Sequence, residues 1–234
     1  MHRVKGHGQF CPVAVASDVF AHRWTPLILR ELFAGSTRFN EIRRCLPLIS
    51  RTTLSQRLRA LECAGVVRIV AGKGQGQEYQ LTEAGQEFRP LVAALGAWGQ
   101  RWTIRVDADH LDAELLMWNV RRRLNPERLP ATRTAVQFEF HGLPPNYRRA
   151  RTFWLIIEDG VGDLCLKDPG TEVDLQVEAD LGAFASVWLG DLQLAQALRQ
   201  GSVRISGARQ LVRQFPSWLL LSHFAAVPRP GAAR

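Results

Sequence analysis

Three leucines recur at helical spacing behind a serine in the first third of this chain. Leu54, Leu58 and Leu61 fall at i, i+4 and i+7, so they share one side of a helix that Ser50 can cap and Gly65 can end. The opposite side of the same stretch carries Arg, Gln and Thr. The pattern predicts a helix over residues 50–64 that buries its leucines and turns a polar, basic side outward.

Shorter helical patterns precede this stretch. Residues 12–22 and 26–34 are predicted to be two helices, with Thr25 as an N-cap and Pro26 at the first helical position, where a missing N–H costs nothing. Residues 38–46 predict a further short helix. Its apolar residues on one face are Phe39, Ile42 and Leu46. Together with the 50–64 helix, this 38–46 helix is expected to form a pair of short helices joined by a tight turn.

A β-branched run, VVRIVAG, follows the leucine-backed helix and is succeeded by KGQGQ and then EYQL. Two strands around a glycine-rich tip are expected, which is the shape of a wing. The glycines are not a dinucleotide-binding loop, because that fingerprint must open a helix, whereas this segment leads into a strand.

The segment from Glu83 to Trp102 is predicted to be one helix with a strongly apolar face. That face comprises Phe88, Leu91, Val92, Leu95, Trp98 and Trp102. So much apolar surface is unusual on a lone exposed helix. We therefore expect this 83–102 helix to pack against a second copy of itself and to make the protein a homodimer.

Charge is distributed unevenly along the chain. Residues 1–105 hold 15 Lys and Arg against seven Asp and Glu, whereas residues 106–234 hold 15 of each, so the first part carries the whole net charge of +8. A basic segment attracts polyanions such as the phosphate backbone of DNA. An anionic membrane surface is the competing partner.

The outward side of the 50–64 helix has the chemistry of a DNA-reading surface. It carries Arg51, Thr52, Ser55, Gln56 and Arg59. Arg can bond guanine and Gln can bond adenine through two groups each, while Thr and Ser reach bases or phosphates. For phosphate contacts we expect Arg68 and Lys73 of the hairpin, and Arg38 is a further DNA-binding candidate. An ordinary solvated surface is the alternative for a polar helix seen alone, but the order helix, turn, Arg-bearing helix and basic hairpin favours double-stranded DNA.

The second half of the chain alternates strands and helices. A helix over 107–124 and a proline-containing connector near 125–133 precede it. Strands are expected in AVQFEFHG, TFWLIIED, GDLCLKD and EVDLQVEA, with turns at Asp159-Gly160 and at Asp168-Pro169-Gly170, and helices at about 180–189 and 191–199. The predicted fold class is α+β, with a winged helix-turn-helix and dimerisation domain at 1–105, a connecting segment at 106–133 and an α/β domain at 134–226.

The first half resembles the HxlR family of winged-helix regulators, relatives of MarR. The resemblance covers roughly residues 8–102 and rests on the early CP, RWTPLILREL, RFNEIRR, the IS that opens the leucine-backed helix, and LTEAG, in family order. It implies a homodimeric transcriptional regulator on a roughly palindromic operator, with recognition helices about 34 Å apart. It also implies a candidate redox sensor at Cys11. Only His7 lies nearby to activate that thiol, so a structural cysteine is favoured.

The second half resembles the sterol-carrier-protein fold over roughly residues 134–224, on the stretch from TEVDLQVEAD through GSVRISG to the last helix. This resemblance implies an apolar cavity for a fatty or aromatic ligand. The side chains expected to line it are Phe138, Phe140, Trp154, Phe184, Trp188, Leu192 and Phe215. The same residues would serve equally as plain core. We expect a hydrophobic small-molecule effector bound there to modulate operator binding.

Other classes of function find little support in the sequence. The four cysteines form no CxxC pair, and neither a GxSxG nor an HExxH motif occurs, so we expect no metal, no cofactor and no enzymatic activity. No apolar stretch is long enough for a signal peptide or a membrane span, which favours the cytoplasm. The alternative function is a lipid carrier or membrane-surface protein with a basic N-terminal domain.

Overall fold

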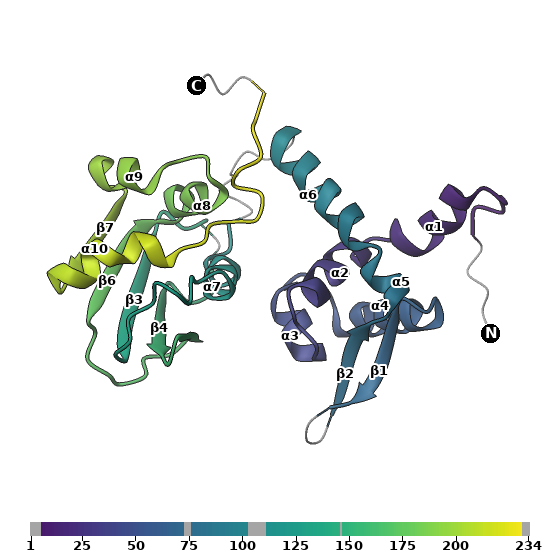
Figure 1. Cartoon of the computed structure of the whole chain (residues 1–234), viewed down its shortest axis with the longest axis horizontal. Helices are drawn as coiled ribbons and strands as arrows, with labels where there is room; N and C mark the ends of the chain where they lie inside the picture. The colour runs from purple at the N-terminus through teal and green to yellow at the C-terminus, as the bar shows by residue number, and fades with distance from the viewer. Residues whose placement is uncertain (1–5, 73–75, 103–110, 146, 231–234) are drawn as a thin grey trace. The chain divides into compact units, whose positions relative to one another are not determined.

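The computed structural model describes residues 6–72, 76–102, 111–145 and 147–230. The chain folds into two compact units, Met1–Gly96 and Ala97–Arg234. Both combine helices with a sheet (Figure 1), which confirms the predicted α+β class. No helix in the described ranges has the length and apolar character needed to cross a membrane.

The first unit is a bundle of short helices with a two-stranded hairpin. Its elements are α1 (Pro12–Phe20), α2 (Thr25–Phe33), α3 (Phe39–Arg44), α4 (Arg51–Cys63), β1 (Val67–Ala71), β2 (Gln77–Leu81), α5 (Glu83–Gln86) and α6 (Arg89–Trp102), the last of which ends within the second unit. The core is mainly aliphatic and joins α2, α3, α4 and β1. This arrangement confirms the expected helix-turn-helix followed by a hairpin.

The start of α2 differs from the prediction. Trp24, with a left-handed φ of 78°, is the N-cap, and its carbonyl accepts from the N–H of Ile28 at 2.8 Å. Thr25 is the first helical residue, is buried and forms no side-chain cap. The cap prediction at Thr25 is therefore wrong, although Pro26 does lie in the first turn as expected.

The pair α3 and α4 forms as predicted. Ser50 caps α4, because its Oγ accepts from the N–H of Thr53 at 3.0 Å. Gly65 follows the helix with a φ of 71°, a conformation that favours glycine. The inward side chains of Leu54, Leu58 and Leu61 are at most 2% exposed. Local capping and burial of the leucines therefore both fix the direction of α4.

The segment after the hairpin contains two helices rather than the single predicted one. Strands β1 and β2 pair antiparallel, and the N–H of Tyr79 donates to the carbonyl of Thr37 at 2.7 Å. The chain then forms α5, turns at Glu87 and Phe88, and starts α6 with Pro90 in its first turn. Proline has no N–H to continue a preceding helix, so it favours a new start at this point.

The second unit consists of a five-stranded sheet with helices packed on it. Its elements are α7 (Ala113–Arg122), β3 (Thr134–His141), β4 (Thr152–Glu158), β5 (Val161–Cys165), β6 (Leu175–Asp180), α8 (Leu181–Leu189), α9 (Leu194–Gln200), β7 (Val203–Gly207) and α10 (Arg209–Trp218). The strand order is β5-β4-β3-β6-β7, with β3 and β6 parallel and the other pairs antiparallel. The four predicted strands are confirmed, and β7 is an additional one.

Aromatic rings fill the space between the sheet and two of its helices. Phe138 of β3 packs against Phe184 of α8 and Phe215 of α10, with ring centroids 6.0 Å apart in both pairs. Both helices therefore cover the same face of the sheet, as the ribbon also indicates (Figure 1). Helix α7 begins later than predicted, at an Asp112 cap, and residues 107–110 of the expected helix lie outside the described residues.

Candidate nucleic-acid interface

One side of α4 is polar and exposed to solvent. We call it the recognition face; it comprises Arg51, Thr52, Ser55, Gln56 and Arg59, all of them exposed. The leucines on the opposite side hold the helix to the core. The sequence-predicted residues of α4 thus lie together on one surface and point away from the protomer's interior.

The side chains of the recognition face lack hydrogen-bond and ion-pair partners among the described residues. In the ranges described above, the five side chains form neither hydrogen bonds nor ion pairs. An unpaired guanidinium or amide at a surface is solvated, and its donors and acceptors stay available to a ligand. Arg59, Gln56 and Arg51 can therefore bond base edges or phosphates without first breaking an internal contact.

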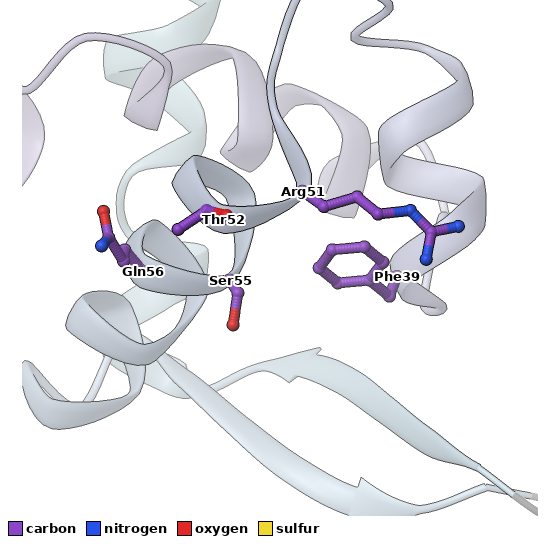
Figure 2. A pocket seen from close by; sticks show the side chains of 5 residues that line it. All are labelled: Phe39, Arg51, Thr52, Ser55 and Gln56. Carbon is purple, nitrogen blue, oxygen red and sulfur yellow. The ribbon is translucent and has the colours of Figure 1, made fainter.

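A pocket of about 510 Å³ lies at the N-terminal half of this face, lined by Phe39, Arg51, Thr52, Ser55 and Gln56. Figure 2 shows the Phe39 ring of α3 beside the Arg51 side chain, with Ser55, Thr52 and Gln56 following along α4. Helix α3 supplies one wall and α4 the others. The pocket therefore combines one aromatic wall with polar groups.

Phe39 is the residue of this pocket that the sequence pattern predicted as a core residue of the 38–46 helix and not as a DNA-binding residue. It is half-buried and packs against the core of the first unit, as that pattern predicts. Periodicity could place its ring toward α4, but it could not reveal that the ring is also accessible beside Arg51. That information depends on the turn that sets α3 against α4.

The remaining predicted DNA-binding residues, which lie outside α4, are placed less uniformly. Arg38 is exposed, and its Nη2 lies 3.4 Å from Glu78 Oε1 on β2. Arg68 is exposed on β1 and donates to Gln80 Oε1 at 3.1 Å. Lys73 lies outside the described residues. Arg38 and Arg68 thus share a surface region with the hairpin, but each has an internal partner that DNA would have to replace.

The apolar face predicted for the 83–102 segment lies largely in solvent. Leu91, Leu95, Trp98 and Trp102 of α6 are 50–60% exposed, whereas Phe88 and Val92 pack against the core of the first unit. The ring of Phe88 stacks on Phe20 of α1 at 5.4 Å between centroids. The segment therefore divides into an anchored start and an exposed apolar remainder.

Comparison with known proteins identifies both halves. Residues 19–107 match the family model described as HxlR-like helix-turn-helix, and residues 120–219 match the SCP-2 sterol transfer family. The uncharacterized HTH-type transcriptional regulator YvaP of Bacillus subtilis is 36% identical over 107 residues, which are 44% of this chain and 96% of YvaP. The chain belongs to the HxlR-like helix-turn-helix family.

Further relatives of this HxlR-like chain match a similar share of it. YdeP of Bacillus subtilis, also an uncharacterized HTH-type transcriptional regulator, is 34% identical over 99 residues, 42% of this chain and 77% of YdeP. A solved structure of the reduced form of the transcriptional regulator YodB from B. subtilis is 30% identical and covers 41% of this chain and 96% of YodB, with a TM-score of 0.36. The SCP-2 match at residues 120–219 adds a second family.

In the SCP-2 half, the seven side chains predicted to line a ligand cavity are placed in two ways. Phe138, Phe140, Phe184 and Phe215 are at most 2% exposed, and their rings pack against one another at centroid distances of 5.6–6.4 Å. Trp154 is 9% exposed, and Trp188 and Leu192 are half-buried. The four phenylalanines form a filled core in this HxlR-like protein, so a ligand would have to displace or adjoin them.

Cys11 lies just before α1 and is exposed. His7, the sequence neighbour that could activate this thiol, is engaged elsewhere: its backbone N–H donates to Asp18 Oδ1 at 3.1 Å, and its ring Nδ1 also contacts that carboxylate. This hydrogen bonding lowers the pKa of Asp18. His7 is therefore hydrogen-bonded to Asp18. A redox role for Cys11 stays a prediction.

Proposed function

We propose that this chain is a sequence-specific DNA-binding transcriptional regulator that inserts the N-terminal half of α4 into the major groove. The observation that carries the proposal is the recognition face, because its Arg, Gln and hydroxyl side chains are exposed and have no partner in the part of the chain that the structure describes. Membership of the HxlR-like family supports it. Arg51, Thr52, Ser55, Gln56 and Arg59 would contact bases or nearby phosphates, and Arg38, Arg68 and Lys73 would contact phosphate.

The regulator would act as a homodimer through the 83–102 segment. Leu91, Leu95, Trp98 and Trp102 recur at i, i+4, i+7 and i+11 on α6, and their exposure leaves a continuous apolar stripe. Burying such a stripe against its own copy removes apolar surface from water and places two recognition helices on one duplex. A dimer whose recognition helices lie about 34 Å apart would read a roughly palindromic operator.

A hydrophobic small molecule bound to the SCP-2 half would modulate this binding. The support is the family match and the aromatic content of that unit. Such an effector shifts operator affinity only by its own difference in affinity for the two forms of the regulator. We propose no catalytic step and no cofactor, and we assign the protein to the cytoplasm because its proposed target is chromosomal DNA.

The test begins with DNA selected from a random pool by the purified full chain. A consensus with two similar halves is expected. If four side chains per protomer contact phosphate, a dimer neutralises about eight phosphates, and the slope of log affinity against log salt should be about −7. Binding to anionic vesicles with no preference among DNA sequences would overturn the proposal and favour the lipid-carrier alternative.

The effector arm uses the same selected operator. A long-chain fatty acid and an extract of hydrophobic metabolites are titrated separately into the protein–operator complex, and binding is followed by fluorescence anisotropy. A ligand that acts through the SCP-2 half should change operator affinity of the full chain. An operator affinity that no ligand changes would contradict the effector proposal while leaving DNA binding intact.

A further inference from the structure

One wall of the pocket beside α4 is an aromatic ring, and the proposed function gives that ring no role. Phe39 is the first residue of α3, and its half-buried ring lines the pocket together with Arg51, Thr52, Ser55 and Gln56. The other four lining residues are all on the recognition face. The ring therefore faces the same space that the base edges would enter (Figure 2).

The base edge that suits an aromatic wall is that of thymine. In the major groove thymine presents a C5-methyl group next to the O4 acceptor, whereas the other three bases carry no methyl group there. An apolar side chain such as Phe can contact this methyl group. Beside the ring, the hydroxyls of Thr52 and Ser55 can donate to O4, and Gln56 can bond adenine.

We propose that Phe39 is a specificity-determining residue that contacts the C5-methyl group of one thymine in each operator half-site, beside the base pair contacted by Arg51. This inference rests on the proposed function, since it presupposes that α4 enters the major groove. It assigns a base-reading role to α3, the first helix of the pair. The anchoring of the ring in the core makes the contact a rigid one.

The experiment uses the full chain and its selected operator. Each thymine is replaced in turn by deoxyuridine, which lacks only the methyl group, and the dissociation constant is measured. One position in each half-site should weaken binding about fourfold, the effect of leaving one methyl group unburied. All other replacements should have little effect.

Two variants assign the methyl contact to a residue. Phe39→Ala should bind the thymine and deoxyuridine operators equally, because the ring is gone. Thr52→Ser removes the methyl group of the Thr52 side chain, which could also contact the thymine methyl, and keeps the hydroxyl. The fourfold preference for thymine over deoxyuridine should therefore persist in this variant. Circular dichroism and thermal melting check that Phe39→Ala, which also loses core packing, is still folded.

Photocrosslinking gives an assignment that needs no variant. The sensitive thymine is replaced by 5-bromodeoxyuridine, whose bromine occupies the place of the methyl group, and the irradiated complex is digested for mass spectrometry. A crosslink to Phe39 is expected. A crosslink confined to other residues, a preference that survives Phe39→Ala, or an operator without any methyl-sensitive thymine would overturn the inference while leaving sequence-specific binding intact. Absence of sequence-specific binding would instead overturn the proposed function, and the inference with it.

Discussion

The arginines of α4 and those of α7 have different surroundings. Arg51 and Arg59 of α4 form no internal bonds in the described part of the chain. By contrast, Arg121 of α7 lies 3.5 Å from Asp163, and Nε of Arg123, just after α7, donates to the carbonyls of Leu220 and Leu221 at 3.0 Å. An arginine that already contacts internal acceptors is less available to a ligand than one without such contacts.

The interiors of the two units differ in a related way. Around α4 the core consists mostly of leucine, isoleucine and valine, and it supports a short helix whose outer side is solvated. The second unit packs phenylalanine and tryptophan between its sheet and helices. The DNA contacts proposed for the first unit therefore lie on its surface, whereas the small-molecule binding proposed for the second unit would involve its aromatic interior.

The largest expected effect is a loss of stability on substitution in the core of the second unit. Phe138→Ala removes a side chain that is 0% exposed and contacts three other phenylalanine rings, so it should lower the free energy of unfolding by about 3–5 kcal/mol. Hydrogen exchange by mass spectrometry should show lost protection in β3 and β4, with protection of α4 unchanged.

A matched control for this variant is Val161→Ala. Val161 is 63% exposed on β5, so its truncation should change stability by less than about 0.5 kcal/mol. If Phe138→Ala were as mild as Val161→Ala, the second unit would not have the tightly packed aromatic core described above. Its interior would then already contain space for a ligand.

Sequence patterns predicted α4 well because its determinants are local. The Ser50 cap, the leucine spacing and Gly65 lie within one short stretch, and the exposed side of the helix follows from the buried side. Predictions failed where tertiary structure decides. Trp24 takes a left-handed conformation that no propensity favours, and the access to Phe39 depends on how α3 meets α4. Strand β7 does alternate Val203 and Ile205 with Arg204 and Ser206, as a strand should, but the alternation spans only four residues and ends at Gly207, so it is too short to predict a strand.

A smaller effect is expected for DNA binding, which directly tests the contrast between the arginines of α4 and those of α7. Arg59→Ala and Gln56→Ala should each cost about 1–3 kcal/mol in affinity for the selected operator and relax base preference at one position. The reason is that each side chain is exposed on the recognition face and forms no bond with any other described residue. Affinity is measured by anisotropy, and base preference by repeating the selection with each variant.

Arg121→Ala is the control for that pair, because it removes the same charge from α7. Its partner is Asp163 of the same unit, so operator affinity and base preference should stay as in the unchanged protein. Equal losses from Arg121→Ala and Arg59→Ala would indicate a diffuse electrostatic attraction to DNA. That result would mean that the arginines of α4 are no more specific for DNA than those of α7.

The smallest expected effect concerns His223, which lies close to Arg123. Burial lowers the pKa of His223, and the positive charge of Arg123 lowers it further. A histidine whose pKa is lower in the folded state binds fewer protons than in the unfolded state, so the second unit should lose stability as the pH falls below about 6.5, the ordinary value. NMR titration of the ring follows the pKa directly, and chemical denaturation at several pH values follows the stability.

Substitution of Arg123 separates its charge from its hydrogen bonds. Arg123→Met removes both, so the pKa of His223 should rise part of the way toward its ordinary value, because burial is the larger cause and persists. Arg123→Lys keeps the charge but loses the planar fork that serves the carbonyls of Leu220 and Leu221. It should therefore keep the pKa of His223 low while destabilising the unit. An unchanged pKa in Arg123→Met would mean that this arginine acts only through its hydrogen bonds.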